Sequence, residues 1–203
     1  MAEIIVLDLE TQHLAGEVGG WHNLEALQVA VAVTWDERHG YRTWWEGQAA
    51  DLVAELHRSD VVVGYNISAF DYAVLSLYAD VEALKERTFD ILDELWQQTH
   101  RRVSLNAIAA LNLGEAKSYE SGADAVRLWR DGRLEDLQAY CQRDVELTKR
   151  LYELWEAEGI LWVSGVSYAI WPGPVTEEVR KEEDGDDVSP FARPRRADPG
   201  RQR

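Results

Sequence analysis

The sequence predicts a single α/β domain built on a mixed β-sheet with helices against it. Three strands come first in the chain and helices then alternate with strands, an order typical of a sheet with both antiparallel and parallel neighbours. The chain has 203 residues, 46% of them hydrophobic, which suits one domain with a sizeable core. We expect five strands, with helices on both faces of the sheet.

The strands are indicated by short apolar runs between turn residues. Ile4–Leu9 is rich in β-branched residues and predicts a buried strand. A glycine-containing loop over residues 11–24 follows it. Leu27–Trp35 and Tyr41–Trp45 then predict two strands joined as a hairpin. Val61–Tyr65 predicts a further buried strand.

The helices are indicated where apolar residues recur at helical spacing. The shorter ones are expected over Ala49–Arg58, Ala69–Tyr78, Asp90–Gln98, from Ser104 to about Gly114, and over Ser121–Trp129. The longest opens at Gly132 and Arg133 and runs to about Glu158. Its apolar stripe has a period close to 3.6 residues and consists of Leu134, Leu137, Cys141, Val145, Thr148, Leu151 and Trp155.

The last part of the chain changes in composition. Gly159–Trp171 predicts a short hairpin that turns near Ser164–Gly165. From Pro172 on, Pro, Gly and charged residues dominate and apolar residues are few, which is typical of disorder. We therefore expect residues 1–172 to form the domain and residues 173–203 to form a disordered tail.

The compartment is indicated by what the sequence lacks. The N-terminal segment MAEIIVLDLE does not have the basic start and apolar run of a signal peptide. No apolar stretch approaches the roughly 18 residues that a membrane helix needs. The single cysteine, Cys141, cannot form an internal disulfide. These features predict a cytoplasmic protein that does not contact a membrane.

The charge of the chain constrains its partners. The net charge is −16, and residues 173–203 hold 8 acidic and 7 basic side chains, so almost all of the excess lies in residues 1–172. Such a surface disfavours tight, nonspecific binding to duplex nucleic acid. If the ligand is a nucleic acid, we expect weak or local contact, or a partner protein that supplies further contacts.

Three segments carry carboxylates at places suited to chemistry. Asp8 and Glu10 lie on one face at the end of the first strand, where two neighbouring acids repel each other unless a cation compensates. Asp71 lies near the start of the helix that follows Val61–Tyr65. Asp144 lies within the longest helix, on the same face as Tyr140.

Each segment also has a purely structural interpretation. Asp8 and Glu10 could be a solvated strand end, and Asp71 could only cap its helix, where the helix dipole favours an acid. Asp144 could lie on a solvated helix face and pair with Arg143 or Lys149.

In combination, the three segments resemble the three motifs of the DEDD superfamily of 3′–5′ exonucleases. The matching stretches are Asp8-Leu9-Glu10-Thr11, Gly64-Tyr65-Asn66 to Phe70-Asp71, and Tyr140 to Asp144. The tyrosine four residues before the last aspartate resembles the tyrosine subtype (DEDDy). The histidine subtype carries a histidine five residues before that aspartate, where this chain has Ala139.

Two finer resemblances cover roughly residues 4–158. The second motif and the segment Ser104–Lys117 are similar to the proofreading domains of family-B DNA polymerases. Glu10-Thr11-Gln12, Gly19-Gly20-Trp21-His22-Asn23 and Gly114 to Lys117 resemble the YprB-like ribonuclease-H-like group, which occurs alone and beside helicase domains. The resemblance implies a ribonuclease-H-like fold and single-stranded DNA or RNA 3′ ends as substrates, with a helicase or another nucleic-acid-processing protein as a partner.

The resemblance also assigns roles. Two Mg²⁺ or Mn²⁺ ions would be held by Asp8, Glu10, Asp71 and Asp144. Carboxylate oxygens are better ligands for these ions than for zinc. Tyr140 would orient the attacking water or the scissile phosphate, and nucleoside 5′-monophosphates would be released. For substrate contacts we expect Thr11, Asn66, Phe70 and Lys117.

Some residues near these motifs have simpler interpretations. Asp90 is expected to cap the following helix, and Trp21, His22 and Asn23 to form a packed loop. Two other functions stay open. One is a binding module of this fold with little catalysis, which the acidic surface favours and the complete set of acids disfavours. The other is an exonuclease specific for RNA, since no residue indicates which contact would recognise a 2′-hydroxyl group.

Overall fold

The protein is built on a five-stranded mixed sheet with the strand order β3-β2-β1-β4-β5. The computed structural model describes residues 2–115, 122–163 and 166–169. The strands are β1 (Ile4–Thr11), β2 (Val29–Asp36), β3 (Gly40–Trp45), β4 (Val61–Gly64) and β5 (Thr88–Asp90). β2 is antiparallel to both β1 and β3, whereas β4 is parallel to both β1 and β5. The predicted mixed sheet is confirmed.

The sequence predicted a fifth strand in the sheet without locating it, and the structure shows that it is β5. β5 has only three residues, too few for a recognisable alternation, and its segment was not predicted as a strand. The predicted hairpin near the end is present as β6 (Ile160–Val163) and β7 (Val166–Ala169), which form a separate two-stranded sheet. Its turn at Ser164–Gly165 lies outside the described residues.

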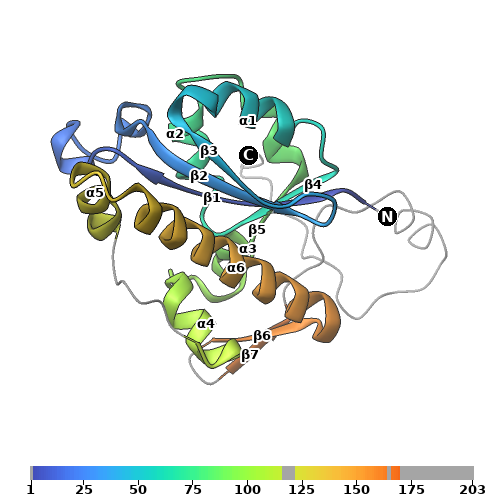
Figure 1. The fold of residues 1–203 in the computed structure, drawn as a ribbon. Helices are drawn as coiled ribbons and strands as arrows, with labels where there is room; N and C mark the ends of the chain where they lie inside the picture. Colours follow the sequence, from blue (N-terminus) through green and yellow to red (C-terminus); the bar gives the residue numbers. More distant parts are fainter. Residues whose placement is uncertain (1, 116–121, 164–165, 170–203) are drawn as a thin grey trace, which may run out of the picture.

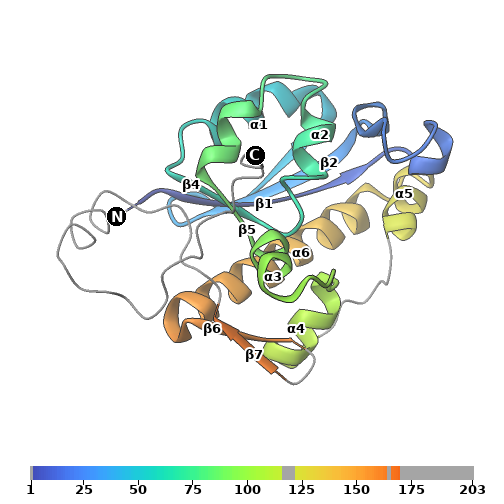
Figure 2. The same cartoon turned by 180° about the vertical axis from the view of Figure 1, so that it is seen from behind.

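Helices cover both faces of the sheet (Figure 1). α1 (Ala49–Leu56) and α2 (Asp71–Leu75) lie on one face, with the 3₁₀ helices η1 (Ala15–Glu17), η2 (Leu24–Leu27), η3 (Glu46–Gln48) and η4 (Glu82–Arg87) in the connections. On the other face lie α3 (Ile91–Thr99), α4 (Leu105–Leu113), α5 (Gly122–Arg130) and α6 (Leu134–Glu158), as the reverse view also shows (Figure 2). Two buried apolar clusters, one on each face, hold these layers together.

The alternation of β1 determines where its acids point. Ile5, Leu7 and Leu9 belong to the apolar cluster beneath α1 and α2, whereas Val6 belongs to the cluster beneath α6. Successive side chains of a strand point to opposite faces, so Asp8 and Glu10 face α6. Parallel pairing with β4 extends only from Ile4 to Val6 on β1, so the part of β1 that carries the acids runs on beyond that paired segment.

Two predicted features differ in the structure. The helix expected over Ala69–Tyr78 is only five residues long, and turns follow it, with Ser76 and Tyr78 N–H groups bonded to carbonyls of Tyr72 and Leu75. Leu134, assigned to the apolar stripe of α6, is 40% exposed because it is the first residue of the helix, where the chain has only begun to cross the sheet. The other members of that stripe are buried.

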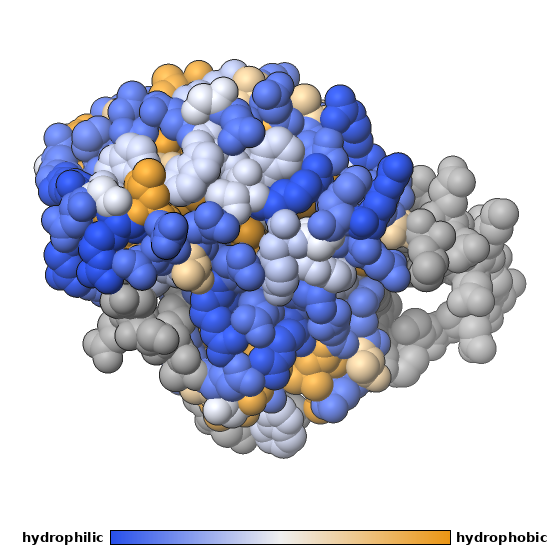
Figure 3. Space-filling view, viewed as in Figure 1, coloured by the Kyte–Doolittle hydropathy of each residue, from blue (hydrophilic) through white to orange (hydrophobic). Residues whose placement is uncertain are grey.

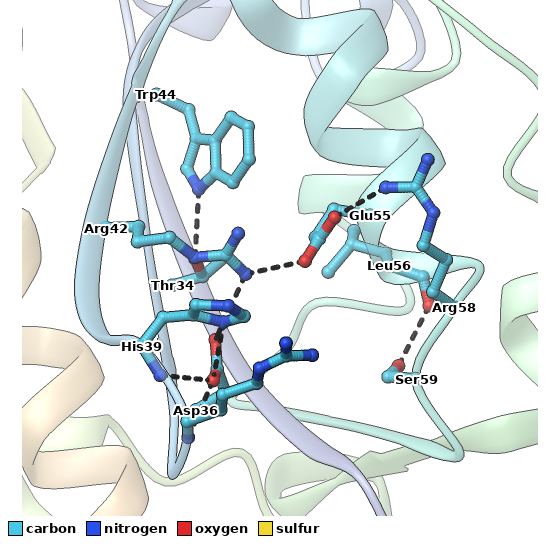
Figure 4. A network of polar contacts seen from close by, with 10 residues as sticks. Thr34, Asp36, His39, Arg42, Trp44, Glu55, Leu56, Arg58 and Ser59 are labelled. Atoms are coloured by element: carbon cyan, nitrogen blue, oxygen red, sulfur yellow. Dashed lines mark hydrogen bonds and ion pairs between the residues drawn. The ribbon is translucent and has the colours of Figure 1, made fainter.

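The outer hairpin is fastened to α1 by a charged network (Figure 4). Arg42 on β3 lies between the carboxylates of Asp36 and Glu55, at 3.0 and 2.9 Å. Burial by itself would raise the pKa of Asp36, but hydrogen bonds from His39 and the charge of Arg42 outweigh it and hold that pKa below its usual range. Asp36 therefore stabilises the folded hairpin in its ionised form.

The face seen in Figure 3 is largely hydrophilic, with apolar side chains in small separate patches. This agrees with the strongly acidic composition. None of the described helices combines the length and apolar character needed to cross a membrane. The boundary expected at residue 172 and the tail over residues 173–203 lie outside the described residues.

Candidate metal centre and cleft

Three of the four predicted carboxylates meet where β1 crosses α6. Each of Asp8, Glu10 and Asp144 offers a carboxylate oxygen, and these oxygens lie within 4.8 Å of one another. Asp144 is only 4% exposed, and the two β1 acids are half-buried. Like charges at this separation repel strongly in a partly dry environment, so a divalent cation is the natural counter-charge.

Asp71 approaches the same place from the other side of β1. The turn between β4 and α2 is tight, because Asn66 has a positive φ of 67° and a Cβ at Gly64 would overlap the side chain of Ile67. Asp90 holds this turn: its carboxylate accepts from the backbone N–H groups of Asn66 and Ser68 at 2.7 and 2.9 Å. It also caps α3 by accepting from Leu92 N–H at 3.0 Å, so the predicted capping role is confirmed.

The surroundings of Asp71 disfavour its charged form. The side chain is 4% exposed, and burial raises its pKa well above the usual range, with further contributions from the negative charges of Asp8 and Asp90. Hydrogen bonds from the backbone N–H groups of Asp71 and Leu9 offset this only in part. Within the described part of the chain, its Oδ1 atom is buried and makes no hydrogen bond. Asp71 is not within the group formed by Asp8, Glu10 and Asp144, but it lines the same cleft. A buried oxygen with an unused lone pair near the charge of Asp8 fits a divalent metal site.

Tyr140 lies one helical turn before Asp144 and faces the same space. It is 7% exposed, and its pKa is raised by burial and then by the charges of Glu10, Asp144 and Asp8. Its hydroxyl group therefore stays protonated at ordinary pH. The group can donate a hydrogen bond here but cannot serve as a base.

Cys141 fixes the contact between α6 and β1. Its buried thiol lies 3.3 Å from the backbone carbonyl of Asp8 and 3.5 Å from its Oδ2 atom. Burial raises the pKa of this thiol, and the neighbouring Asp8, Glu10 and Asp144 raise it further, so it remains a neutral donor. The sequence placed Cys141 in an apolar stripe and excluded an internal disulfide, but it did not predict this contact with Asp8.

One open cleft of about 650 Å³ is lined by Asp8, Glu10, Asp71, Tyr140 and Asp144. Three of the residues expected to contact substrate, Thr11, Asn66 and Phe70, are in its wall. The Thr11 hydroxyl donates to the His13 carbonyl at 3.0 Å and so helps to shape the adjoining loop. Lys117, the fourth, lies outside the described residues.

The wall also contains an exposed aromatic side chain and a charged side chain that were not predicted as site residues, Trp21 and Arg102. Trp21, expected in a packed loop, is 73% exposed and contacts Phe70 with ring centroids 6.4 Å apart. Arg102, just before α4, donates to the Asn66 side chain at 2.6 Å. The sequence contains a feature that could have indicated each of them. Trp21 follows two glycines, and Arg102 belongs to an arginine pair, Arg101-Arg102, in an acidic chain.

A second hollow, of about 950 Å³, lies at the other end of β1. Glu3, Trp35, Lys149 and Glu156 are among its lining residues. Within residues 2–115, 122–163 and 166–169, the only set of side chains with metal-ligand spacing is Asp8, Glu10 and Asp144. The candidate site is therefore the smaller cleft.

Comparison with known proteins agrees with this fold. Residues 5–156 match the model of the RNase_H superfamily. None of the curated proteins matches the chain in sequence. Among solved structures, the family B DNA polymerase from the hyperthermophilic archaeon Pyrobaculum calidifontis is similar, with a TM-score of 0.57 and 17% identity. The similarity covers 77% of this chain and 25% of the polymerase chain, so this chain corresponds to about a quarter of that protein and shares its fold there.

Proposed function

The chain belongs to the RNase_H superfamily, and on that basis we propose that it is a metal-dependent 3′–5′ exonuclease of the tyrosine subtype. Its substrates would be single-stranded nucleic-acid 3′ ends, DNA in preference to RNA. The products would be nucleoside 5′-monophosphates. The superfamily suggests phosphodiester hydrolysis, while the direction of cleavage and the strand preference are our proposals.

The observation that carries this proposal is the meeting of Asp8, Glu10 and Asp144 at one cleft. Asp71 lines the same cleft, and its buried, unbonded oxygen points to a ligand that the protein itself does not supply. Together these acids would hold two Mg²⁺ or Mn²⁺ ions. Such ions, when bound, lower the pKa of a water molecule and stabilise the charge that develops on a scissile phosphate.

The remaining residues act by positioning. The Tyr140 hydroxyl, kept protonated by its surroundings, would donate a hydrogen bond to the attacking water or to a phosphate oxygen. The Cys141 thiol keeps the backbone and carboxylate of Asp8 against α6. Asp90 holds the turn that carries Asn66 and leads to Asp71.

The test is a cleavage assay with end-labelled strands. The protein is incubated with 5′- or 3′-labelled single-stranded DNA and RNA in Mg²⁺, Mn²⁺ or EDTA. A 3′–5′ exonuclease releases a labelled mononucleotide at once from the 3′-labelled strand and yields a descending ladder from the 5′-labelled one. EDTA should abolish both. Internal fragments at early times would instead indicate an endonuclease.

Asp144→Asn is the matching variant, and Asp131→Asn is its control. The same change of a carboxylate to an amide is made in the cleft in one case and at an exposed position outside it in the other. Asp144→Asn should abolish cleavage and the rise in Tm on adding Mg²⁺, because a ligand that binds only the folded state stabilises it. Asp131→Asn should behave as wild type. Near wild-type cleavage by Asp144→Asn would overturn the proposed site.

A second candidate function, a binding module with little catalysis, is favoured by the net charge of −16. It predicts that the strands are bound but remain intact in every metal. The same assay with a gel-shift measurement therefore separates the two functions.

A further inference from the structure

The loop between β1 and β2 exposes a tryptophan beside the acidic cleft. Trp21 is 73% exposed, the largest exposed fraction among the exposed large hydrophobic side chains in the described residues. Keeping a ring of this size in water forgoes the stabilisation that its burial would give. Exposed aromatic groups next to a cleft are common where a ligand covers them.

The loop that carries Trp21 is well defined. The Gly20 N–H donates to the Ala15 carbonyl at 2.7 Å, and the Asn23 side chain donates to the Val18 carbonyl at 2.8 Å. Glu17 pairs with Arg130, which ties the loop to α5; the two segments lie side by side in Figures 1 and 2. The position of Trp21 at the mouth of the cleft is therefore set by the fold.

The ring faces a second aromatic side chain. Phe70 lies 6.4 Å away between ring centroids, with 58° between the ring planes. The two rings come from different segments, and both line the cleft that holds the carboxylates. Because the two rings are tilted, they do not stack face to face. Most of the surface of the exposed Trp21 ring is therefore accessible to a planar ligand.

A positively charged side chain lines the same cleft. Arg102 lines it and bonds to Asn66, in the turn just before Phe70. In the described part of the wall, it is the residue with a permanent positive charge. A planar apolar surface and a guanidinium group beside a metal-binding cluster match the base and the phosphate of a nucleotide.

We propose that Trp21 stacks on a base of the bound strand and makes the cleft selective for unpaired 3′ ends. Within a duplex only the outer face of the terminal pair is uncovered, whereas every base of an unpaired 3′ end can turn a face to the tryptophan, so stacking favours the unpaired strand. This inference rests on the proposed function and adds a specificity-determining residue to it. The stacking compensates for the acidic surface, because it needs no basic patch.

The experiment compares binding of two labelled oligonucleotides by fluorescence anisotropy in EDTA, where cleavage is absent. One is a normal single strand, and the other has abasic sites at its 3′ end. The proteins are wild type, Trp21→Ala, Trp21→Phe and the control Trp162→Ala. Trp162 on β6 is also exposed, at 45%, and does not line the cleft.

Trp21→Ala should weaken binding of the normal strand by about 5- to 150-fold, the range for loss of one stacked base. It should leave binding of the abasic strand unchanged. Trp21→Phe should recover part of the loss, and Trp162→Ala should match wild type. Equal losses on both strands, or no loss on either, would overturn the proposal.

Cleavage by the same proteins in Mg²⁺ distinguishes this proposal from the nuclease assignment. If Trp21→Ala cleaves as fast as wild type while Asp144→Asn is inactive, the stacking role is overturned and the nuclease assignment stands. If strand binding depends on Trp21 but no protein cleaves the strand, the nuclease assignment is overturned and the stacking role stands. Because Trp21 is exposed, unchanged melting of Trp21→Ala is expected and shows that the fold is kept.

Discussion

Asp71 is a carboxylate whose surroundings oppose its charge. Burial is the main cause, and Asp8 adds to it. The cost of burying this acid near Asp8 and Asp90 is a property of the protein without metal. Removing the Asp71 carboxylate should therefore affect the stability of the metal-free protein and its activity separately.

Asp71→Asn should raise the stability of the metal-free protein at pH 7, with Tm higher by about 2–8 °C. The folded-state pKa of Asp71 lies above its unfolded value of about 3.9, so stability is lost as the pH rises from there towards the folded-state pKa. The asparagine variant lacks this loss. Its advantage should be small near pH 4 and grow as the pH rises, as measured by thermal melting in EDTA.

The same variant should lose most of the stabilisation that Mg²⁺ gives to wild type. Asp131→Asn serves as the control for the amide substitution. A Tm below that of wild type at pH 7 in EDTA would show that the ionised Asp71 makes favourable contacts instead.

Tyr140 allows a test that removes a single oxygen atom. Tyr140→Phe keeps the ring and should slow single-turnover cleavage by about 10- to 1,000-fold, the loss of one transition-state hydrogen bond of about 1.4–4 kcal/mol. Metal affinity should hardly change. Because the Tyr140 pKa is raised, the wild-type rate should not fall through its ionisation as the pH approaches 10. Unchanged cleavage would remove Tyr140 from the mechanism, and lost metal binding would show that it is a ligand.

At the scale of elements, the turn from β4 to α2 has the tightest requirements. Gly64 leaves room for the buried Ile67, and the next residues place Asn66 and Phe70 in the cleft wall. The turn therefore links a packing constraint to the geometry of the site.

Gly64→Ala should destabilise the protein by about 1–3 kcal/mol, because the added methyl group overlaps Ile67. Activity should also fall, since relief of the overlap moves the turn. Gly47→Ala is the control, because a Cβ there meets nothing within 4 Å. The measurement is urea unfolding of both variants.

A double-mutant cycle with Ile67→Ala sharpens this test. If the overlap is the cause, Gly64→Ala should cost less in the Ile67→Ala background than in wild type. Additive effects would mean that Gly64 matters for another reason.

At the scale of the whole molecule, the net charge and residues 173–203 are features separate from the predicted site residues. The acidic residues outnumber the basic ones in residues 1–172 taken together, and we propose that residues 173–203 contribute little to the domain. That segment contains few apolar residues and none of the motif residues.

Deletion of residues 176–203 should therefore leave the Tm within about 2 °C and the rate of single-strand cleavage near that of the full chain. Thermal melting and the 3′-label assay measure the two effects. A large fall in Tm would show that the segment packs on the domain, and a large fall in rate alone would show that it contributes to substrate binding.

The sequence by itself determined the order of the elements other than β5, the mixed sheet, and the residues of the acidic cluster, Asp8, Glu10 and Asp144. Alternation along Ile4–Leu9 and the helical period around Asp144 are local properties, so they can be read without knowing what packs against them. Tertiary structure decided the rest: the short strand β5, the raised pKa of Asp71, and the contact of Trp21 with Phe70. Each of these depends on segments distant in the chain that come together only when the sheet and its loops are assembled, so no local pattern records them.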